Sequence, residues 1–183
     1  MPILTGYPVS AFDILSGSSD LSTVGGTFRL DPDFDADTDR ININVTDADG
    51  NFEGDYSSNE SGDDGSQSAV ITDADGSQTA SGQIYLEGGR TLTAPDGSTI
   101  TVYKMEIGGV KVGWLAQPEL QPGVTYQIDS SFNVSSGNAP AFSSFTDTVD
   151  YDQDDANVVQ GGGLDDDIST GAGNDVVNAG GGR

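Results

Sequence analysis

The sequence predicts an all-β protein, an antiparallel β-sandwich or jelly roll followed by a short repetitive C-terminal segment. Short runs of apolar and β-branched residues recur along the chain and are separated by Gly, Pro, Asn and Asp. No window carries the apolar stripe with a 3.6-residue period that marks an amphipathic helix. Only five of the thirty acidic residues are Glu. Asp carboxylates bond nearby backbone N–H groups in turns, so this bias also favours a loop-rich β-protein.

The predicted strands succeed one another closely through the first part of the chain. The best supported is the pair 99–107 and 110–116, because Gly108 and Gly109 separate two apolar runs by the two residues of a type I′ or II′ hairpin. Trp114 comes after Val110 and Val112 in alternation, and we expect all three on one buried face. The remaining strands are expected at 9–15, 27–30, 40–46, 68–72, 82–87, 90–94, 124–129 and 141–149.

The composition changes near residue 150. Aromatic residues end at Tyr151, and Gly, Asp, Asn and single aliphatic residues dominate from there on. We therefore expect two domains, a β-sandwich at 1–148 and a repeat segment at 149–183.

The repeat segment has a period of nine residues. Residues 161–169 and 170–178 form two consecutive units, a third unit begins at Ala179, and a degenerate unit precedes them at 152–160. Asn157, Asp166 and Asp175 occupy the sixth positions, and Val159, Ile168 and Val177 occupy the eighth. This pattern resembles the nonapeptide G-G-x-G-x-D-x-U-x of RTX (hemolysin-type) calcium-binding repeats.

The resemblance implies a short parallel β-roll that binds Ca²⁺. Each unit would supply a Gly-rich turn, whose carbonyls and Asp side chain coordinate the ion, and a short strand with its aliphatic residue inward. Leu164 and Thr170 depart from the Gly positions of the pattern, and Asn157 departs from the Asp position. The ligands that the resemblance assigns are Asn157, Gly161, Gly163, Asp166, Gly171, Gly173 and Asp175.

The resemblance also implies a location. Proteins with such repeats are exported by type I secretion with a C-terminal signal, which fits a chain start without the basic and apolar regions of a signal peptide. We therefore expect a secreted or cell-surface protein whose repeat segment is truncated at Arg183. The segment GGVKVGWLAQPELQPGVTY is in addition similar to N-terminal domains of secreted alphaproteobacterial proteins with Hint or RTX modules.

A row of acidic residues suggests a further calcium site. Asp33, Asp35, Asp37 and Asp39 stand at every second position, so an extended backbone would place them on one face, about 6–7 Å apart. Such a row is unfavourable unless it is hydrated or bridged by a cation, and Phe34 indicates packing against the domain. We expect calcium on two or more of the four Asp residues; the alternative is a solvated acidic loop.

Two nearly identical segments each succeed a predicted strand. They are Val-Thr-Asp-Ala-Asp-Gly at 45–50 and Ile-Thr-Asp-Ala-Asp-Gly at 71–76. Each predicts an Asx turn that ends in a Gly with positive φ. Calcium binding by Asp47 and Asp49, or by Asp73 and Asp75, is the alternative interpretation.

Composition excludes several classes of function. The absence of Cys and His excludes cysteine nucleophiles, Ser-His-Asp triads and typical zinc sites. A net charge of −24 with six scattered basic residues argues against nucleic acid as a partner, and no apolar run is long enough for membrane insertion. Paired carboxylates, for example with Glu87 or Glu106, leave only a carboxylate-based hydrolase as a catalytic alternative.

The expected function is a non-catalytic structural or adhesive module that folds on calcium outside the cell. Its expected partners are calcium ions, with self-association or an extracellular polysaccharide as further partners. The alternatives are an accessory module of a larger secreted enzyme and a carbohydrate-binding module. The second would use exposed aromatic residues among Trp114, Tyr85, Tyr103 and Tyr126.

Overall fold

The computed structural model describes residues 3–54, 62–145, 158–160 and 176–178. The chain divides into two compact units, Met1–Thr146 and Asp147–Arg183. The expected domain boundary, after residue 148, lies outside the described residues.

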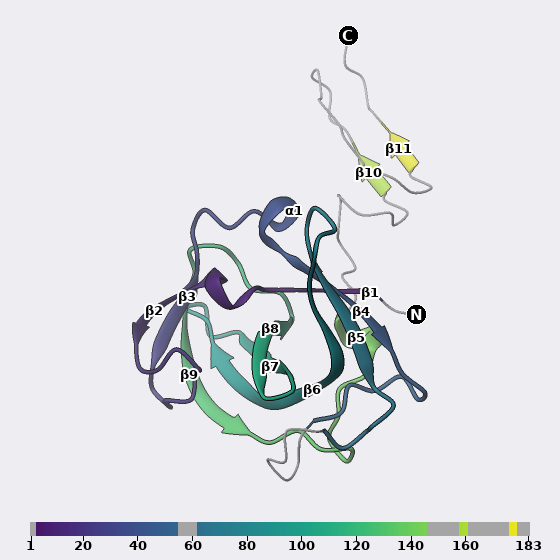
Figure 1. Ribbon diagram of the computed structural model, residues 1–183. Coiled ribbons are helices and arrows are strands. Elements are labelled where there is room, and N and C mark those ends of the chain that lie inside the picture. Colours follow the sequence, from purple (N-terminus) through teal and green to yellow (C-terminus); the bar gives the residue numbers. More distant parts are fainter. Residues whose placement is uncertain (1–2, 55–61, 146–157, 161–175, 179–183) are drawn as a thin grey trace. The chain divides into compact units, whose positions relative to one another are not determined.

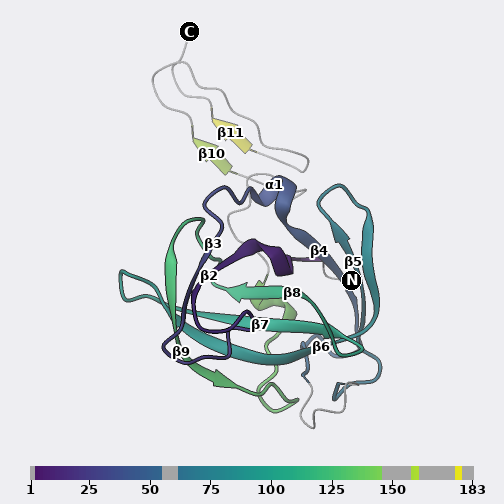
Figure 2. The ribbon, with the colours of Figure 1, turned by 60° about the vertical axis from the view of Figure 1, so that its left-hand side comes forward.

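The first unit is built on one antiparallel sheet that curls into a half-barrel (Figures 1 and 2). Short helices η1 (Val9–Ala11), α1 (Ala36–Asp39) and η2 (Phe142–Phe145) connect the strands or come after them. The nine strands are β1 (Ile3–Gly6), β2 (Phe12–Ser16), β3 (Thr27–Leu30), β4 (Ile41–Thr46), β5 (Ser68–Asp73), β6 (Gln78–Thr93), β7 (Thr99–Ile107), β8 (Val110–Gln117) and β9 (Thr125–Phe132).

The predicted antiparallel β-structure is confirmed, but the strands form one curled sheet rather than the two packed sheets of a sandwich. The order is β1-β4-β5-β6-β9-β3-β2, and β6 also pairs with β7, which pairs with β8. A bridge between Tyr7 and Trp114 connects the segment after β1 to β8. The sheet is continuous because β6 belongs to both halves of it.

β6 joins the two strands predicted at 82–87 and 90–94. It continues through Gly88 and Gly89, with a register shift against β7 between Leu86 and Gly88. A Cβ atom on Gly89 would lie 2.1 Å from the ring of Phe132, so a side chain here would displace β9 from β6. The two Gly residues therefore bend a long strand instead of ending it.

The hairpin between β7 and β8 is confirmed, with Gly108 and Gly109 at φ 58° and 76°. Trp114 is buried as predicted, at 1% exposure, and its ring meets Phe12 edge-on at 6.0 Å. The expected shared face is wrong for Val110, which is 64% exposed. A bulge in β8 opposite Met105 and Glu106 breaks the alternation between Val110 and Trp114.

Two differences at the ends of the predicted strands result from local backbone geometry. Residues 9–11 form a 3₁₀ turn after Pro8, so β2 begins at Phe12. The described part of the strand expected at 141–149 is the 3₁₀ helix η2, whose Phe142 and Phe145 are buried in the core. The rest of that range lies outside the described residues.

In the second unit, β10 (Val158–Gln160) and β11 (Val176–Asn178) form a parallel pair. Val159 is opposite Val177, eighteen residues further along the chain.

Candidate functional site

The turn after β4 gathers hydrogen bonds onto its two Asp side chains. Oδ2 of Asp47 accepts from the backbone N–H groups of Asp49 at 3.0 Å and Gly50 at 2.8 Å. Oδ1 of Asp49 accepts from Asn51 N–H at 2.9 Å. Gly50 has φ 91°, so the predicted Asx turn with a positive-φ Gly is confirmed.

The chain then enters the core and brings a third carboxylate back to the turn. Phe52 is fully buried, and its N–H donates to Pro140 O at 2.8 Å. Glu53 is fixed through its backbone, because its N–H donates to Gln67 Oε1 at 2.9 Å and its carbonyl accepts from Leu86 N–H at 3.0 Å. The side chain of Glu53 is thereby held at the turn with only 6% of the residue exposed.

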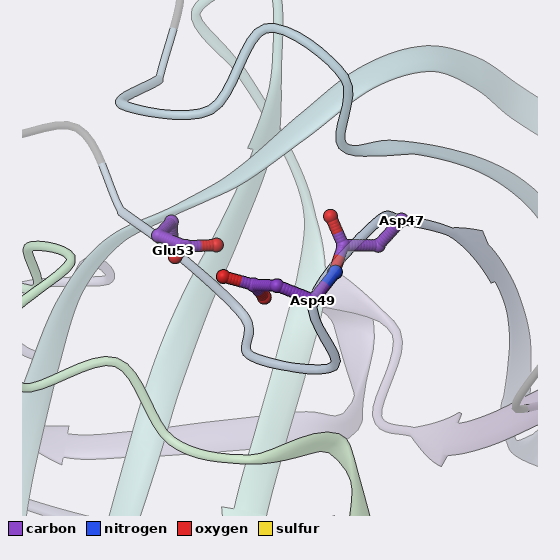
Figure 3. A group of neighbouring side chains, drawn as sticks. All are labelled: Asp47, Asp49 and Glu53. Carbon is purple, nitrogen blue, oxygen red and sulfur yellow. The ribbon is translucent and has the colours of Figure 1, made fainter.

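Asp47, Asp49 and Glu53 form one carboxylate cluster (Figure 3). Each offers an oxygen atom, and these three atoms lie within 4.8 Å of one another. Glu53 Oε2 and Asp47 Oδ1 are buried and have no hydrogen-bond donor. Among the described residues, no other carboxylate oxygen is buried in this way.

The pKa shifts result from this arrangement. Burial raises the pKa of Glu53 above its ordinary value of 4.5, and the charges of Asp49, Asp47 and Asp64 raise it further. Burial also acts to raise the pKa of Asp47, but the hydrogen bonds from nearby backbone N–H groups outweigh it and lower this pKa. Hydrogen bonds from the backbone thus keep Asp47 ionised. At Glu53, the cost of burying an ionised carboxylate outweighs any such bonds, and its pKa stays raised.

Among the described residues, no third carboxylate joins the second turn of the same sequence. Ser77 N–H donates to Oδ1 of Asp73 and of Asp75, both at 2.8 Å, which confirms the second Asx turn. Contact with Asp75 raises the pKa of Asp73, whereas the hydrogen bond from Ser77 lowers that of Asp75. In the part of the chain that the structure describes, only the first turn has three acidic groups close enough to share an ion.

The backbone from Asp33 to Asp39 is not extended, so the expectation that these four side chains share one face of a strand is wrong. Asp35 caps α1 by accepting from Asp37 N–H at 2.9 Å, and Asp39 Oδ2 accepts from Asp35 N–H at 2.9 Å. Short Asp side chains favour such local bonds over a straight strand.

Two members of the row nevertheless line one hollow. Asp33 and Asp39, together with Asp31 and Phe34, face an open hollow of about 330 Å³, whereas Asp35 and Asp37 do not line it. Calcium binding by the row stays a prediction. The seven ligands expected in the repeats, from Asn157 to Asp175, lie outside the described residues.

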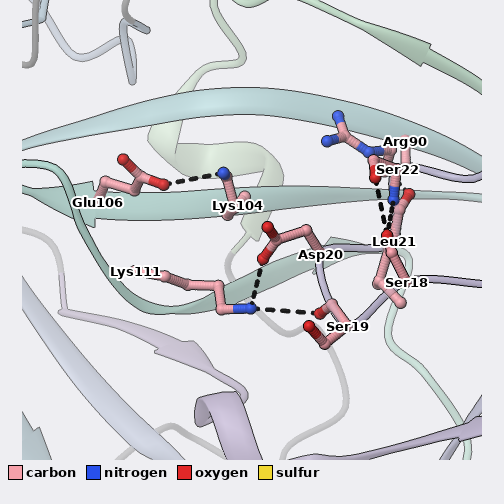
Figure 4. A network of polar contacts seen from close by, with 9 residues as sticks. All are labelled: Ser18, Ser19, Asp20, Leu21, Ser22, Arg90, Lys104, Glu106 and Lys111. Atoms are coloured by element: carbon pink, nitrogen blue, oxygen red, sulfur yellow. Dashed lines mark hydrogen bonds and ion pairs between the residues drawn. The ribbon is translucent and has the colours of Figure 1, made fainter.

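Basic side chains from β6 and β8 hold the loop between β2 and β3 against the sheet (Figure 4). Lys111 Nζ lies 2.8 Å from Asp20 Oδ1 and donates to Ser19 O at 3.2 Å. The hydrogen bond from Lys111 is the main reason why the pKa of Asp20 is lowered. Lys104 pairs with Glu106 at 2.8 Å, so the Glu106 carboxylate is neutralised within the sheet rather than held in an apolar setting.

Arg90 completes this contact. Its Nε donates to Leu21 O at 2.9 Å and its Nη1 to Gly89 O at 2.9 Å, while Ser18 and Ser22 bond to each other across the loop at 2.8 Å. Lys111 and Arg90 therefore both tie this loop to the sheet.

The aromatic residues considered for sugar binding are buried. Trp114, Tyr85, Tyr103 and Tyr126 expose at most 8% of their surface. They therefore form no exposed aromatic row.

Glu53 is the one member of the carboxylate cluster that sequence reasoning missed. The signal present in the sequence is Glu53 three residues beyond the Asp47-Ala-Asp49-Gly50 turn, directly after the apolar Phe52.

Comparison with known families, with curated protein sequences and with solved structures finds no match. Among the described residues, no helix is long and apolar enough to cross a membrane.

Proposed function

We propose that this protein is a secreted, non-catalytic calcium-binding module whose C-terminal repeats fold on Ca²⁺ into a parallel β-roll. The observation that carries the proposal is the parallel pairing of β10 with β11. The offset between them is eighteen residues, twice the nonapeptide period, and it sets one eighth-position residue, Val159, opposite another, Val177.

The offset agrees with the geometry of a roll. A three-residue strand and then a six-residue turn reverse the chain direction once per unit. Strands one unit apart then run in opposite directions, whereas strands two units apart run in the same direction and can pair in parallel. A flexible acidic linker has no reason to pair at twice its sequence period.

Calcium fits the chemistry of the intervening turns. Asp166 and Asp175 supply charged oxygens, and Gly at positions 161, 163, 171 and 173 lets backbone carbonyls approach an ion. Without a cation, carboxylates in successive turns repel each other, in a chain of net charge −24. Calcium is scarce inside cells and abundant outside, so the segment would fold after export.

A structural role agrees better with the first unit than carbohydrate binding does. The four aromatic residues that would stack on a sugar are in the core, and their burial supports a scaffold role. A scaffold of this kind also suits an accessory module of a larger secreted protein.

Calcium titration of the full chain, monitored by hydrogen exchange, tests the proposal. Amides of 158–160 and 176–178 are expected to become protected as calcium rises and to lose that protection with chelator. Asp166→Ala and Asp175→Ala are each expected to weaken this response about tenfold or more, because each removes a charged ligand.

Asp96→Asn is the control, since Asp96 bonds Ser98 within an exposed turn of the first unit. Protection of the repeats that is independent of calcium would refute the β-roll, and so would equal responses from all three variants.

A further inference from the structure

We propose that Asp47, Asp49 and Glu53 form a separate calcium site in the first unit. The site shares no residue with the repeats and does not depend on the β-roll.

Glu53 occupies a position that calls for a partner. A carboxylate is rarely placed where it is more than nine-tenths buried unless a partner compensates it. Glu53 Oε2 has no hydrogen-bond donor, although the backbone of the same residue is held by Gln67 and Leu86. Figure 3 shows its carboxylate facing that of Asp49. The fold thus holds an acid toward other acids.

Among the described residues, the charges that act on Glu53 are negative. They belong to Asp49, Asp47 and Asp64, all of them carboxylates. Asp47 adds a second buried oxygen without a donor. Lys104, Lys111 and Arg90 are engaged elsewhere in the sheet, as Figure 4 shows. A cation bound by the three carboxylates would offset the negative charge that Glu53 and Asp47 bring to the turn.

The chemistry of the ligands indicates which cation fits. All the available ligands are hard oxygen atoms, which suit calcium and magnesium. The three oxygen atoms lie within 4.8 Å of one another, and Asp49 is exposed, so water can complete the coordination. Three carboxylates on an irregular turn suit calcium, which accepts many protein oxygens in flexible geometry, whereas magnesium demands a near-ideal octahedron and keeps several of its waters.

The same turn holds a later segment of the chain. Gly50 O accepts from Phe142 N–H at 3.0 Å, Phe52 N–H donates to Pro140 O at 2.8 Å, and Asn51 forms a bridge with Ala141. An ion that fixes residues 47–53 would also fix 140–142. The expected consequence is added protection from hydrogen exchange in both segments.

The test uses the full chain and monitors backbone amide signals by NMR during titration with calcium chloride and, separately, magnesium chloride. The amides of Asp49, Gly50, Asn51 and Glu53 are expected to shift saturably with calcium, and only weakly with magnesium. Glu53→Gln is expected to reduce the calcium affinity at these amides at least tenfold.

Asp75→Asn is the matched control. It makes the corresponding carboxyl-to-amide change in the second turn, and the response of residues 47–53 is expected to stay unchanged. Asp49→Asn serves as a second variant, because Asp49 is exposed and its replacement leaves the core intact. It too is expected to weaken calcium binding.

Thermal unfolding separates a cation site from a merely structural acid. In chelator, Glu53→Gln is expected to raise the melting temperature, since a neutral amide replaces a buried charge without a cation. Calcium is expected to raise the melting temperature of the parent chain, and this rise is expected to disappear in Glu53→Gln. A variant destabilised equally in both conditions would overturn the inference.

The amides of the repeats report in the same spectra. A calcium response at 158–160 and 176–178 with none at 47–53 would overturn this inference and leave the β-roll standing. A calcium response at 47–53 alone would support this inference and overturn the β-roll.

Discussion

Two turns of this protein have the same five residues and different surroundings. Thr-Asp-Ala-Asp-Gly occurs at 46–50 and again at 72–76. In both, Asp side chains accept from backbone N–H groups and the Gly has a positive φ, 91° for Gly50 and 89° for Gly76. Only the first turn has a buried carboxylate beside it.

The path of the chain beyond each turn makes the difference. After Gly76, the chain returns at once into β6 and closes a hairpin, with Asp73 N–H donating to Ser77 O at 3.0 Å. After Gly50, it continues into the core at Phe52 and delivers Glu53 to the turn. Local sequence therefore determines the turn, while the third carboxylate depends on distant parts of the fold.

Replacing Gln67 is expected to have the largest effect on the difference between the two turns, because this side chain holds the backbone of Glu53. Its side chain bonds both backbone groups of Glu53 and donates to Ile84 O at 2.6 Å, all in the core. Gln67→Leu would leave Glu53 N–H and Ile84 O without these partners. We expect a loss of about 2–4 kcal/mol in the free energy of unfolding, measured in denaturant.

Gln78→Leu is the control beyond the second turn. Gln78 is exposed and its side chain bonds Ser81 at 3.3 Å, so we expect a change within about 0.5 kcal/mol. Equal losses in the two variants would show that the hydrogen bonds of Gln67 to Glu53 and Ile84 add no more stability than the exposed bond of Gln78 does.

Gly50 and Gly76 allow a second comparison. Replacing either one should change stability equally, whereas only Gly50 should affect calcium binding. A Cβ on Gly50 or Gly76 would meet no atom within 4 Å, so only the positive φ opposes Ala at either position. We expect Gly50→Ala and Gly76→Ala each to lower the free energy of unfolding by about 1 kcal/mol in chelator.

Calcium should then distinguish the two variants. Titration monitored at the amides of 47–53 is expected to show weaker binding for Gly50→Ala and unchanged binding for Gly76→Ala. If both variants bound calcium equally well, the geometry of the first turn would not contribute to the site.

Features of the fold that depend on neighbouring residues could be predicted from the sequence. The Gly108-Gly109 hairpin and the Asx turns after Asp47 and Asp73 result from backbone preferences over a few residues. The burial of Trp114 is expected from the size of an indole ring in a strand.

Features that depend on distant contacts could not be predicted in this way. Gly88 and Gly89 suggested a break between strands, yet the ring of Phe132 packs where a side chain of Gly89 would lie. The alternation from Asp33 to Asp39 suggested a strand, but capping by Asp35 favoured a short helix. Glu53 is a ligand candidate only because Gln67, fourteen residues away, fixes its backbone.

The smallest expected effect is a difference in pH dependence between the two turns in chelator. Burial, then the charges of Asp49, Asp47 and Asp64, raise the pKa of Glu53 in the folded chain above 4.5. Protonation of Glu53 therefore favours folding. Its stabilising contribution is full below the unfolded pKa and is lost as pH rises through the folded one.

At the second turn, the pKa of Asp73 is raised mainly by Asp75, and that of Asp75 is lowered mainly by Ser77. Asp73 loses stabilisation as pH rises, whereas Asp75 loses it as pH falls, so the two contributions oppose each other. The stability difference between Glu53→Gln and the parent chain should therefore grow as pH rises through the folded pKa of Glu53. The corresponding difference for Asp75→Asn should vary less over the same range. Denaturant unfolding at matched ionic strength, from about pH 4 to pH 7, measures both differences. Parallel pH profiles would mean that the buried carboxylate does not distinguish the two turns.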